Sequence, residues 1–588
     1  MIKERLEQLI QEALGELQAE GKLQMAELPA VILEHPENPD HGDYSLNLAF
    51  LLASHMRKSP FEVAGFLVEN LRYFVEGSLD VHRMEIAGAG FINVYLSRRF
   101  FVEEITRVLR EGDSYGKRKK EKKTMVIDYS GPNIAKPFGV GHLRSTIIGQ
   151  ALFNLYSFLG WKVIGDNHIG DWGTPHGKIL YELKTKKLEG KDKKETREIL
   201  NNLTIQDLEE LYIEFGREAA DNPALEEQAR LWFQKLEQGD KEAKMMWEYA
   251  KEISLQEFRK IYTLLNVDIT HTLSESFYEP MLSGIIREAQ KKGIAKESQG
   301  AQIISYPEEK LPPAVILKSD GATNYFTRDL AAIAYRLKKW NPDIIVYETG
   351  VEQMLNFQQL FWAAELLGWA SRDRFYHVTH GLYRTKEGKF STRKGHTVHL
   401  EGVLKEAVER AKKMIEQSET GGEFSEAEKD KIAKAVGIGG VKYNDLSQHP
   451  KKDIIFDWEK ILNLKGNSAP YLQYTYARCV SILERARFKE PAKTMTYEDL
   501  TTAELNVLQL LYRFEEIVEE SAEKFAPNIL CTYVFDVAQK YNTFYSIHSV
   551  LQAETKDQKE FRLALTAATA QILKNSLHLL GITVLARM

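Results

Sequence analysis

The sequence predicts a multidomain α/β protein, with a parallel-sheet domain in the middle and a helical domain at the C-terminal end. A chain of 588 residues is too long for one hydrophobic core and is expected to divide into three or four domains. After Thr124, buried strand patterns alternate with helical patterns, which is typical of a parallel sheet covered by helices. After Val398 the pattern is almost wholly helical.

Residues 1–110 are expected to form a small α+β domain. Ile2, Leu6 and Ile10 lie near one face of a first helix, and GAGFINVYLS ends the unit with alternating strand character. The basic stretch KRKKEKK at 117–123 is most simply a solvated linker. The alternative is a patch that touches an RNA backbone.

Residues 120–400 are expected to form the parallel-sheet domain. TMVIDYS, a helix after His142 and WKVIGDNHIGDWG make up a βαβ unit. Residues 183–262 are charged, helical and poor in glycine, which indicates an insertion. Strand patterns return at AQIISYP, AVILKS and DIIVYETG, and we expect these segments to join the same sheet.

Two helical regions are expected to complete the chain. Residues 401–464 form a junction, and residues 465–588 form a bundle. Segments such as LNVLQLLYRFEEIVEESAEKF have apolar residues three and four apart, as bundle helices do. The last region has 14 Lys and Arg against 14 Asp and Glu, so charge alone does not nominate it for nucleic-acid binding.

Composition narrows the class of protein further. Hydrophobic residues make up 43% and charged residues 28%, which is ordinary for a globular protein. There is no run of about 18 apolar residues, and the start, MIKERLEQLIQEAL, does not resemble a signal peptide. We therefore expect a cytoplasmic protein without a membrane partner. The two cysteines, Cys479 and Cys531, exclude a disulfide framework and a zinc site of four cysteines.

Two loops of the middle domain have the composition of a phosphate site. The first, GPNIAKPFGVGHLRST, joins a strand to a helix, whose free N–H groups and dipole favour an anion. The second, EGKFSTRKGHT at 387–397, is densely cationic, as suits a loop over a leaving pyrophosphate. Singly, the first is most simply a turn and the second an exposed hairpin. The presence of both loops in one domain is much harder to explain as a coincidence.

Seven segments, in order along the chain, resemble the arginyl-tRNA synthetases. These are SGPNIAKPFGVGHLRST, DNHIGDWGT, SESFY, DGATNYFTRDLAA, GVEQMLNFQQLF, KFSTRKG and GNSAPYLQYTYAR. The first and sixth resemble the HIGH and KMSKS signatures of class I aminoacyl-tRNA synthetases. Two positions depart from the signatures, since Gly139 replaces the first histidine of HIGH and Thr392 the second lysine of KMSKS.

The resemblance implies a fold and an activity. The fold would be a Rossmann-like catalytic domain with a helical insertion, an additional N-terminal tRNA-binding domain and a C-terminal anticodon-binding bundle. The activity would be ATP-dependent activation of arginine to arginyl-adenylate, followed by transfer to the terminal adenosine of tRNA(Arg). The implied partners are arginine, ATP with Mg²⁺ as substrate and tRNA(Arg). We expect no tightly bound cofactor, no metal site and a monomer.

The resemblance also assigns residues to ATP and its chemistry. His142 would donate to the α-phosphate, and Gly139 and Gly141 would let ATP approach the backbone. Because Thr392 carries no charge, Lys136 would supply the missing cation. The catalytic set is His142, Lys136, Lys389 and Ser391, and the ATP-binding set is Gly139, Gly141, His142, Lys389 and Arg393.

Arginine must be selected by carboxylates, because its guanidinium is always charged and offers donors in a fixed fork. The resemblance assigns guanidinium recognition to Asp329, with Tyr325 and Gln353. Asn133 and Glu275 would bind the α-amino end or line the same pocket, and Asp171 and Trp172 would shape its floor. Taken without the resemblance, Asp329 is more simply a helix cap and Tyr325 a core residue.

Aromatic and cationic residues in the terminal domains are expected to contact tRNA, because such side chains stack on and bind unpaired bases. The segment GDYSLN contains two of these candidates, Tyr44 and Asn47, for which a role in stabilising a turn is nearly as simple an interpretation as a contact with tRNA. The predicted tRNA-binding residues are Tyr44, Asn47, Tyr476, Arg478, Lys540 and Tyr545.

Two alternatives belong to other classes. A small nucleotidyltransferase with a HIGH-like loop leaves the insertion, the second loop and the helical end unexplained. A non-catalytic RNA-binding relative is consistent with Gly139 and Thr392, but it has no physical need for His142, Lys389 and Asp329 together. Among class I synthetases, the two lone cysteines disfavour the cysteinyl type and the modest insertion disfavours the large editing types.

Overall fold

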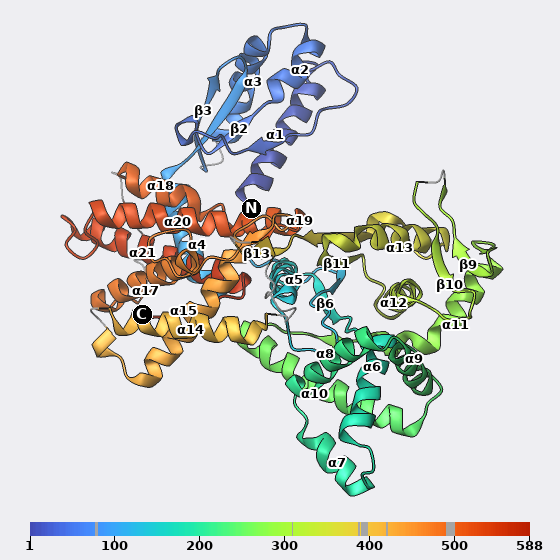
Figure 1. The fold of residues 1–588 in the computed structure, drawn as a ribbon. Coiled ribbons are helices and arrows are strands. Elements are labelled where there is room, and N and C mark those ends of the chain that lie inside the picture. Colours follow the sequence, from blue (N-terminus) through green and yellow to red (C-terminus); the bar gives the residue numbers. More distant parts are fainter. Residues whose placement is uncertain (77–79, 308–309, 386–387, 390–397, 419–420, 490–499) are drawn as a thin grey trace.

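The computed structural model describes residues 1–76, 80–307, 310–385, 388–389, 398–418, 421–489 and 500–588. Figure 1 shows the N-terminal unit at the top, the helical C-terminal part at the left and the central sheet between that part and a lobe of helices and strands. Among the described residues, none of the helices combines the length and apolar character that crossing a membrane requires.

The centre of the molecule is a parallel sheet with the strand order β12-β11-β5-β6-β7. Its strands are β5 (Thr124–Asp128), β6 (Lys162–Asn167), β7 (His271–Thr272), β11 (Ile344–Gly350) and β12 (Phe375–His380). All neighbouring pairs are parallel, as the alternation of strands and helices predicts.

The two faces of this sheet are covered by different helices. Val126 of β5 belongs to the same apolar cluster as helix α12 (Tyr325–Trp340). Its neighbour Ile127 belongs to the cluster of helix α5 (Gly141–Phe158), because successive strand residues point to opposite faces. The carboxyl ends of the strands therefore open between two helix layers, where ligands of such sheets bind.

Two of the predicted strands lie in a different sheet. β9 (Ala301–Ile304) and β10 (Ala314–Leu317) pair antiparallel, and β8 (Ala295–Ser298) completes a three-stranded sheet at the right edge of Figure 1. The expectation that AQIISYP and AVILKS join the parallel sheet is wrong. The reason is the connection: a parallel neighbour needs a long crossover, whereas only Gln299 and Gly300 separate β8 from β9.

The helical insertion packs around its own apolar cluster, which includes Leu208, Leu211 and Trp232. It contains α6 (Thr174–Glu182), a short π-helix (Leu183–Lys187), α7 (Lys193–Asn202), α8 (Ile205–Asp221), α9 (Ala224–Glu237) and α10 (Lys241–Leu265). Helix α10 returns the chain to the central sheet, and α11 (Glu275–Lys291) follows it.

Glu182 at the end of α6 predicts a pH dependence of stability. Its side chain is fully buried and neither carboxylate oxygen has a hydrogen-bond partner in the described structure. Burial, and then the charge of Glu218, raise its pKa to about 7. The folded state therefore holds a proton that the unfolded state has already released, so stability falls as pH rises from about 4.5 through 7.

We expect the Glu182→Gln variant to lose this fall and to be more stable than the parent by about 1–3 kcal/mol at pH 8, allowing for partial screening. Near pH 4.5 the two proteins should match. Thermal unfolding at both pH values checks this, with Glu189→Gln, an exposed residue of the same insertion, as the control. Parallel stability curves for parent and Glu182→Gln would contradict the assignment.

The C-terminal part is a bundle that shares one continuous core with α5 and with the N-terminal unit. Its longer helices are α14 (Leu400–Glu416), α15 (Glu426–Leu446), α17 (Ala469–Ala486), α18 (Thr502–Leu511), α19 (Phe514–Glu523), α20 (Pro527–Ile547) and α21 (Lys556–Leu579).

The N-terminal unit combines a sheet with flanking helices. Its elements are α1 (Ile2–Ala19), α2 (Leu48–Met56), α3 (Pro60–Glu76) and the strands β1 (Leu33–Glu34), β2 (Tyr44–Leu46), β3 (Val81–Ala87) and β4 (Phe91–Leu96). Helix α4 (Arg98–Glu111) then leads into the helical part and packs against α21.

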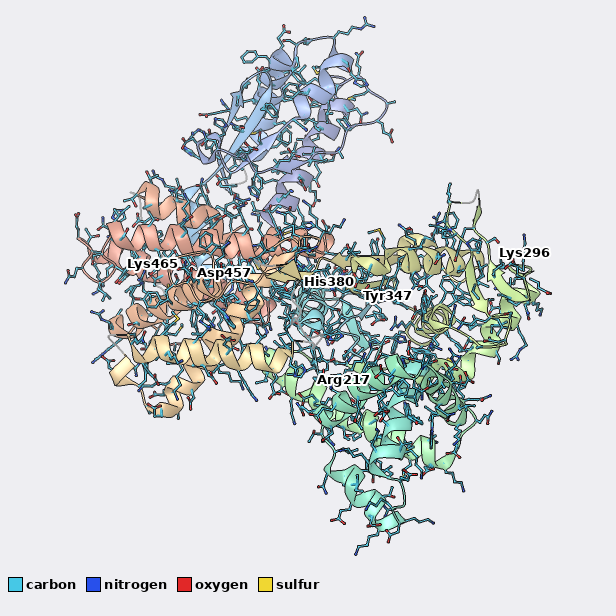
Figure 2. The ribbon with its side chains drawn as sticks, in the orientation of Figure 1. Arg217, Lys296, Tyr347, His380, Asp457 and Lys465 are labelled. Carbon is cyan, nitrogen blue, oxygen red and sulfur yellow. The ribbon has the colours of Figure 1, made fainter. Side chains whose placement is uncertain are left out.

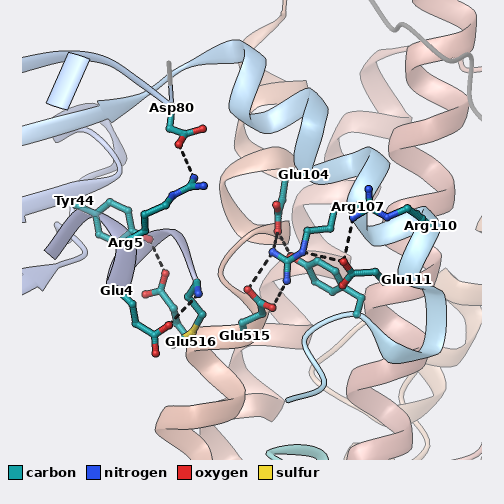
Figure 3. Close-up of polar contacts among 12 residues, drawn as sticks. Glu4, Arg5, Tyr44, Asp80, Glu104, Arg107, Arg110, Glu111, Glu515 and Glu516 are labelled. Atoms are coloured by element: carbon teal, nitrogen blue, oxygen red, sulfur yellow. Dashed lines mark hydrogen bonds and ion pairs between the residues drawn. The ribbon is translucent and has the colours of Figure 1, made fainter. Parts of the chain in front are cut away.

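Tyr44 holds the N-terminal unit against the helical part (Figure 3). Its ring is fully buried, and its hydroxyl donates to Glu516 Oε1 at 2.5 Å. Nε2 of His35 lies 2.9 Å from Glu516 Oε2, and Arg107 pairs with Glu515 nearby. The prediction that Tyr44 contacts tRNA is therefore wrong for this structure, because a ring without exposed surface cannot stack on a base.

Candidate active site

A cavity of about 670 Å³ opens at the carboxyl ends of β5, β11 and β12. Figure 2 labels two of its lining residues, Tyr347 and His380, near the centre of the molecule. Seven predicted site residues line this single cavity although they lie far apart in the sequence: Asn133, Gly141, His142, Glu275, Tyr325, Asp329 and Gln353.

His142 lies in the first turn of α5, at the start of the helix that follows β5. Burial, more than any neighbouring charge, lowers the pKa of its imidazole to about 4, so the ring is neutral at pH 7. Its Nδ1 has no hydrogen-bond partner among the described residues. A neutral imidazole with an uncommitted nitrogen at a helix N-terminus is suited to donate to a phosphate oxygen.

The loop before α5 is held in a sharp bend. Ser130 and Gly131 both have positive φ, at 77° and 54°. The Ser130 N–H donates to Ser145 Oγ at 2.9 Å, and the Gly131 N–H donates to Asn167 Oδ1 at 3.0 Å. Gly139 lies further along this loop and does not line the cavity, because its backbone pairs with His399.

Lys136 lies beside this site without lining the cavity. Its ammonium is 4.2 Å from the ring centroid of Tyr212 on α8, which is cation–π distance. Its charge also contributes, less than burial does, to the lowered pKa of His142. The insertion therefore holds the cation that the sequence assigned to ATP.

The second predicted loop is described only at its first strand. The backbone of Lys389 lies in β14 (Gly388–Lys389), which pairs antiparallel with β13 (Tyr383–Thr385). Ser391, Thr392 and Arg393 lie outside the described residues.

Asp329 lies on α12 and lines the same cavity as His142. Its Oδ2 accepts from Asn356 Nδ2 at 3.0 Å, and its Oδ1 lies 3.6 Å from His168 Nε2. Burial raises the pKa of this carboxyl, and the His168 charge opposes that rise. The alternative of a helix cap is wrong, because Asn324 caps α12 by accepting from the Thr327 N–H at 3.2 Å.

Tyr325 and Glu275 stand around Asp329. Tyr325 is 60% exposed, so it forms the mouth of the cavity and is not a core residue. Glu275 begins α11, and its Oε2 accepts from the Trp172 N–H at 3.3 Å. Asp171 is buried and binds Lys251 Nζ at 2.6 Å. Neither Asp171 nor Trp172 lines the cavity, although the preceding Gly170 does, so a role for these two residues in shaping its floor remains a prediction.

Asn133 is fitted to the loop after β6. A Cβ on Gly170 would lie 1.9 Å from Asn133 Oδ1, so this approach requires glycine. Gln353 ends the short helix Val351–Gln353 after β11. Both side chains therefore stand on the rim where neighbouring strands end.

The site also contains a guanidinium of the protein itself, that of Arg336, which the sequence analysis did not identify. Arg336 of α12 is fully buried, and its Nη2 lies 2.7 Å from Asp128 Oδ2 and 2.8 Å from Asp166 Oδ2. Both carboxylates raise its pKa further above the usual value, despite burial. The pattern AYRLKKW resembles a solvated helix face, so it does not point to a buried arginine at this position. The only sequence signal for a charged partner was Asp128, because it lies at the end of a predicted strand. Because Arg336 engages two acids, Asp329 is left for another cation.

Three family descriptions match successive parts of the chain. "Arginyl tRNA synthetase N terminal domain" matches residues 4–96, "tRNA synthetases class I (R), catalytic domain" residues 104–458 and "DALR anticodon binding domain" residues 472–588. The chain belongs to the arginyl-tRNA synthetase family. The family, the fold class and the arginine–tRNA ligase function predicted from the sequence are confirmed.

Relatives of this synthetase match it over almost its whole length. The arginine–tRNA ligase of Clostridium perfringens is 38% identical over 560 residues, covering 95% of this chain and 96% of that protein. The ligase of Halothermothrix orenii is 37% identical over 585 residues, covering 99% and 98%. As a class I synthetase, the enzyme uses ATP, arginine and tRNA.

Solved structures show the same fold. The arginyl-tRNA synthetase of Thermus thermophilus matches with a TM-score of 0.81 at 22% identity, covering 100% of both chains. That of Plasmodium falciparum matches with a TM-score of 0.80 at 24% identity, covering 100% of this chain and 99% of the other.

The helical part of the synthetase presents a small aromatic and cationic surface. The guanidinium of Arg478 lies 4.9 Å from the ring centroid of Tyr474 and 5.2 Å from that of Tyr545. Tyr474 is 43% exposed and Tyr545 37% exposed. The sequence selected Tyr476 instead, which is half-buried and packs against the core, because residues two apart point to different sides of a helix.

Two further predicted tRNA contacts are available at the surface. Lys540 is exposed on α20, the helix that also presents Tyr545. Asn47 is exposed at the start of α2, near Phe50, whose ring lies 4.9 Å from that of Phe91. Within the described part of the chain, no cluster of three or more His, Cys, Asp or Glu side chains is arranged to bind a metal ion.

Proposed function

We propose that this synthetase condenses arginine with ATP in the cavity described above and then transfers the arginyl group to the terminal adenosine of tRNA(Arg). The observation that carries the proposal is the cavity itself, which has His142 at a helix N-terminus on one side and Asp329 on the other. One end suits an anion and the other a cation. The reaction depends on holding these two substrates together in line.

The proposed roles follow from position. His142 and the first N–H groups of α5 bind the α-phosphate of ATP, which enters with Mg²⁺ as its counter-ion. Lys136 and Lys389 bind the phosphates that leave as pyrophosphate. Asp329 binds the guanidinium, with Tyr325 and Gln353, while Asn133 and Glu275 hold the α-amino end. Ser391 and Arg393 remain assigned to ATP by their place in the signature.

The experiment is aminoacylation of total tRNA with each of the twenty amino acids in labelled form. We expect label to enter tRNA with arginine and not with lysine, whose point charge does not reproduce the fork of a guanidinium. Charging with another amino acid would overturn the assignment.

Other features of the proposal rest on the sequence. The division into 1–110, 120–400 with its insertion 183–262, 401–464 and 465–588 remains a proposal, as do a monomeric state and a cytoplasmic location. We assign the N-terminal unit and the helical part to tRNA, through Asn47 and through the surface formed by Tyr474, Arg478 and Tyr545.

We expect Tyr545→Ala to raise the KM for tRNA roughly ten- to a hundredfold, because stacking on a base is worth about 1–3 kcal/mol. Tyr474→Ala should act similarly, with the KM values for ATP and arginine unchanged. Tyr376→Ala, which removes a ring with 38% exposure from β12, is the control. An unchanged tRNA KM in both bundle variants would remove this surface from the tRNA site.

Deletion of the chain from about Lys465 onward should also raise the KM for tRNA sharply. Helices α17 and α21, however, share the core that contains α5, so the deletion exposes apolar surface of the catalytic part. The point variants are therefore the sharper test.

A further inference from the structure

Two polar side chains of the cavity wall, those of Arg144 and Tyr383, both contact Asp445, which lies outside the sheet. Arg144 follows His142 on α5 by half a turn and is almost fully buried. Its Nε lies 3.1 Å from Oδ1 of Asp445, a fully buried residue at the end of α15. The Tyr383 hydroxyl at the start of β13 donates to the other oxygen of the same carboxylate.

The chain after Asp445 reinforces both contacts. Arg144 Nη1 donates to the carbonyl of Lys452 at 2.6 Å. Strand β15 (Ile454–Ile455) then pairs parallel with β13, and the Leu382 N–H donates to Asp453 Oδ1 at 2.8 Å. One segment of the helical part, residues 445–456, is therefore fastened to α5 on one side and to β13 on the other.

This segment touches the two elements that carry the ATP loops. Helix α5 starts with Gly141 and His142, and β13 leads through its pairing of Arg384 with Lys389 into the second loop. Arg144 and Tyr383 both line the cavity, while Asp445 does not. Asp445 therefore does not contact the expected ATP site itself. It contacts Arg144 on α5 and Tyr383 on β13, the two elements that carry the ATP loops.

We propose that Asp445 is a positioning residue for adenylation: by holding Arg144 and Tyr383 at once, it sets the distance between the helix of His142 and the strand that leads to Lys389. The inference rests on the proposed function of these two loops. Since the carboxylate comes from α15, the contact also links the adenylation site to the helices that include the proposed tRNA surface.

The test uses Tyr383→Phe, which removes one hydroxyl and leaves the ion pair of Arg144 with Asp445 in place. Direct replacement of Asp445 would bury an unpaired guanidinium and endanger folding. The matched control is Tyr115→Phe, because Tyr115 is also buried and donates to a carboxylate, that of Glu104, away from the cavity.

We expect Tyr383→Phe to lower the single-turnover rate of arginyl-adenylate formation about ten- to a hundredfold, as a small misplacement of a catalytic group does. The KM values for arginine and tRNA should stay within about twofold of the parent values. Tyr115→Phe should keep the parent rate while losing a similar amount of thermal stability.

A second measurement separates positioning from general weakening. In a Lys389→Ala background the strand no longer carries its lysine, so adding Tyr383→Phe should change the rate by less than about twofold. Equal rates for Tyr383→Phe and Tyr115→Phe, or independent effects of Tyr383→Phe and Lys389→Ala, would overturn the proposal. Failure of the parent enzyme to charge tRNA with arginine would instead overturn the proposed function.

Discussion

Replacement of Asp329 by alanine should abolish useful arginine binding. Removing one partner of a buried charge pair costs about 3–5 kcal/mol, which corresponds to a loss of roughly 10²–10³-fold or more in affinity. The nearby carboxylates of Asp128 and Asp166 cannot take the place of Asp329 in binding arginine, because both are already bound to Arg336. The side chain of Asp329 lines the cavity, accepts a hydrogen bond from Asn356 and lies 3.6 Å from His168 Nε2. Among the described residues it forms no ion pair with a lysine or arginine, so this place is left for the guanidinium of the substrate.

The Asp329→Asn variant should recover little affinity, because its amide presents N–H donors where a guanidinium also presents donors. Calorimetric titration with arginine measures the loss, and the KM for ATP should remain unchanged. Asp320→Asn, an exposed carboxylate just before α12, is the control. Near-normal arginine affinity in either Asp329 variant would show that Asp329 is not part of the pocket.

Replacement of Lys136 by alanine should lower the rate of adenylation by roughly 10²–10³, the usual loss when one preorganised transition-state donor is removed. The second signature loop has Thr392 where a lysine is expected, so a cation must come from elsewhere. Lys136 lies close enough to His142 to affect its pKa, on a loop bounded by Pro132 and Pro137. Arginine binding should change little.

The structure sharpens this experiment. Lys136 stacks on Tyr212, so its removal also takes away a cation–π contact with α8. Lys178→Ala is the matched control, because Lys178 lies 5.1 Å from the ring of Phe215 on the same helix and does not line the cavity. Lys136→Arg should be partly active, since a fork does not reproduce a point charge.

The measurement is single-turnover formation of arginyl-adenylate with tRNA supplied. A Lys136→Ala rate within about threefold of the parent enzyme would show that this lysine has no part in the transition state, because the loss expected for such a donor is about two decades. A similar slowing in Lys178→Ala would assign the effect to the insertion and not to the nucleotide.

Local sequence information determined the elements and the two loops. Apolar spacing predicted β5, β6 and β11 of the parallel sheet, the insertion and the bundle, because each period of two or of 3.6 is set by neighbouring residues. It did not predict β7 and β12, and it assigned β9 and β10 to the wrong sheet. Glycine, histidine and lysine in two short stretches marked the nucleotide side, since a helix N-terminus binds anions wherever it occurs. The resemblance of seven segments then gave the family and the cavity-lining residues around Asp329.

Only the tertiary structure decided which of these elements and residues meet. Tyr44 was buried by a helix some 470 positions away in the chain, and Tyr474 rather than Tyr476 reached the surface because of how α17 packs. Arg144 and Asp445 are 301 residues apart, and Arg336 pairs with acids on two strands. Periodicity reports which face of an element is apolar, but the partner that covers a face, and the charge that neutralises a buried group, come from distant chain segments brought together by folding.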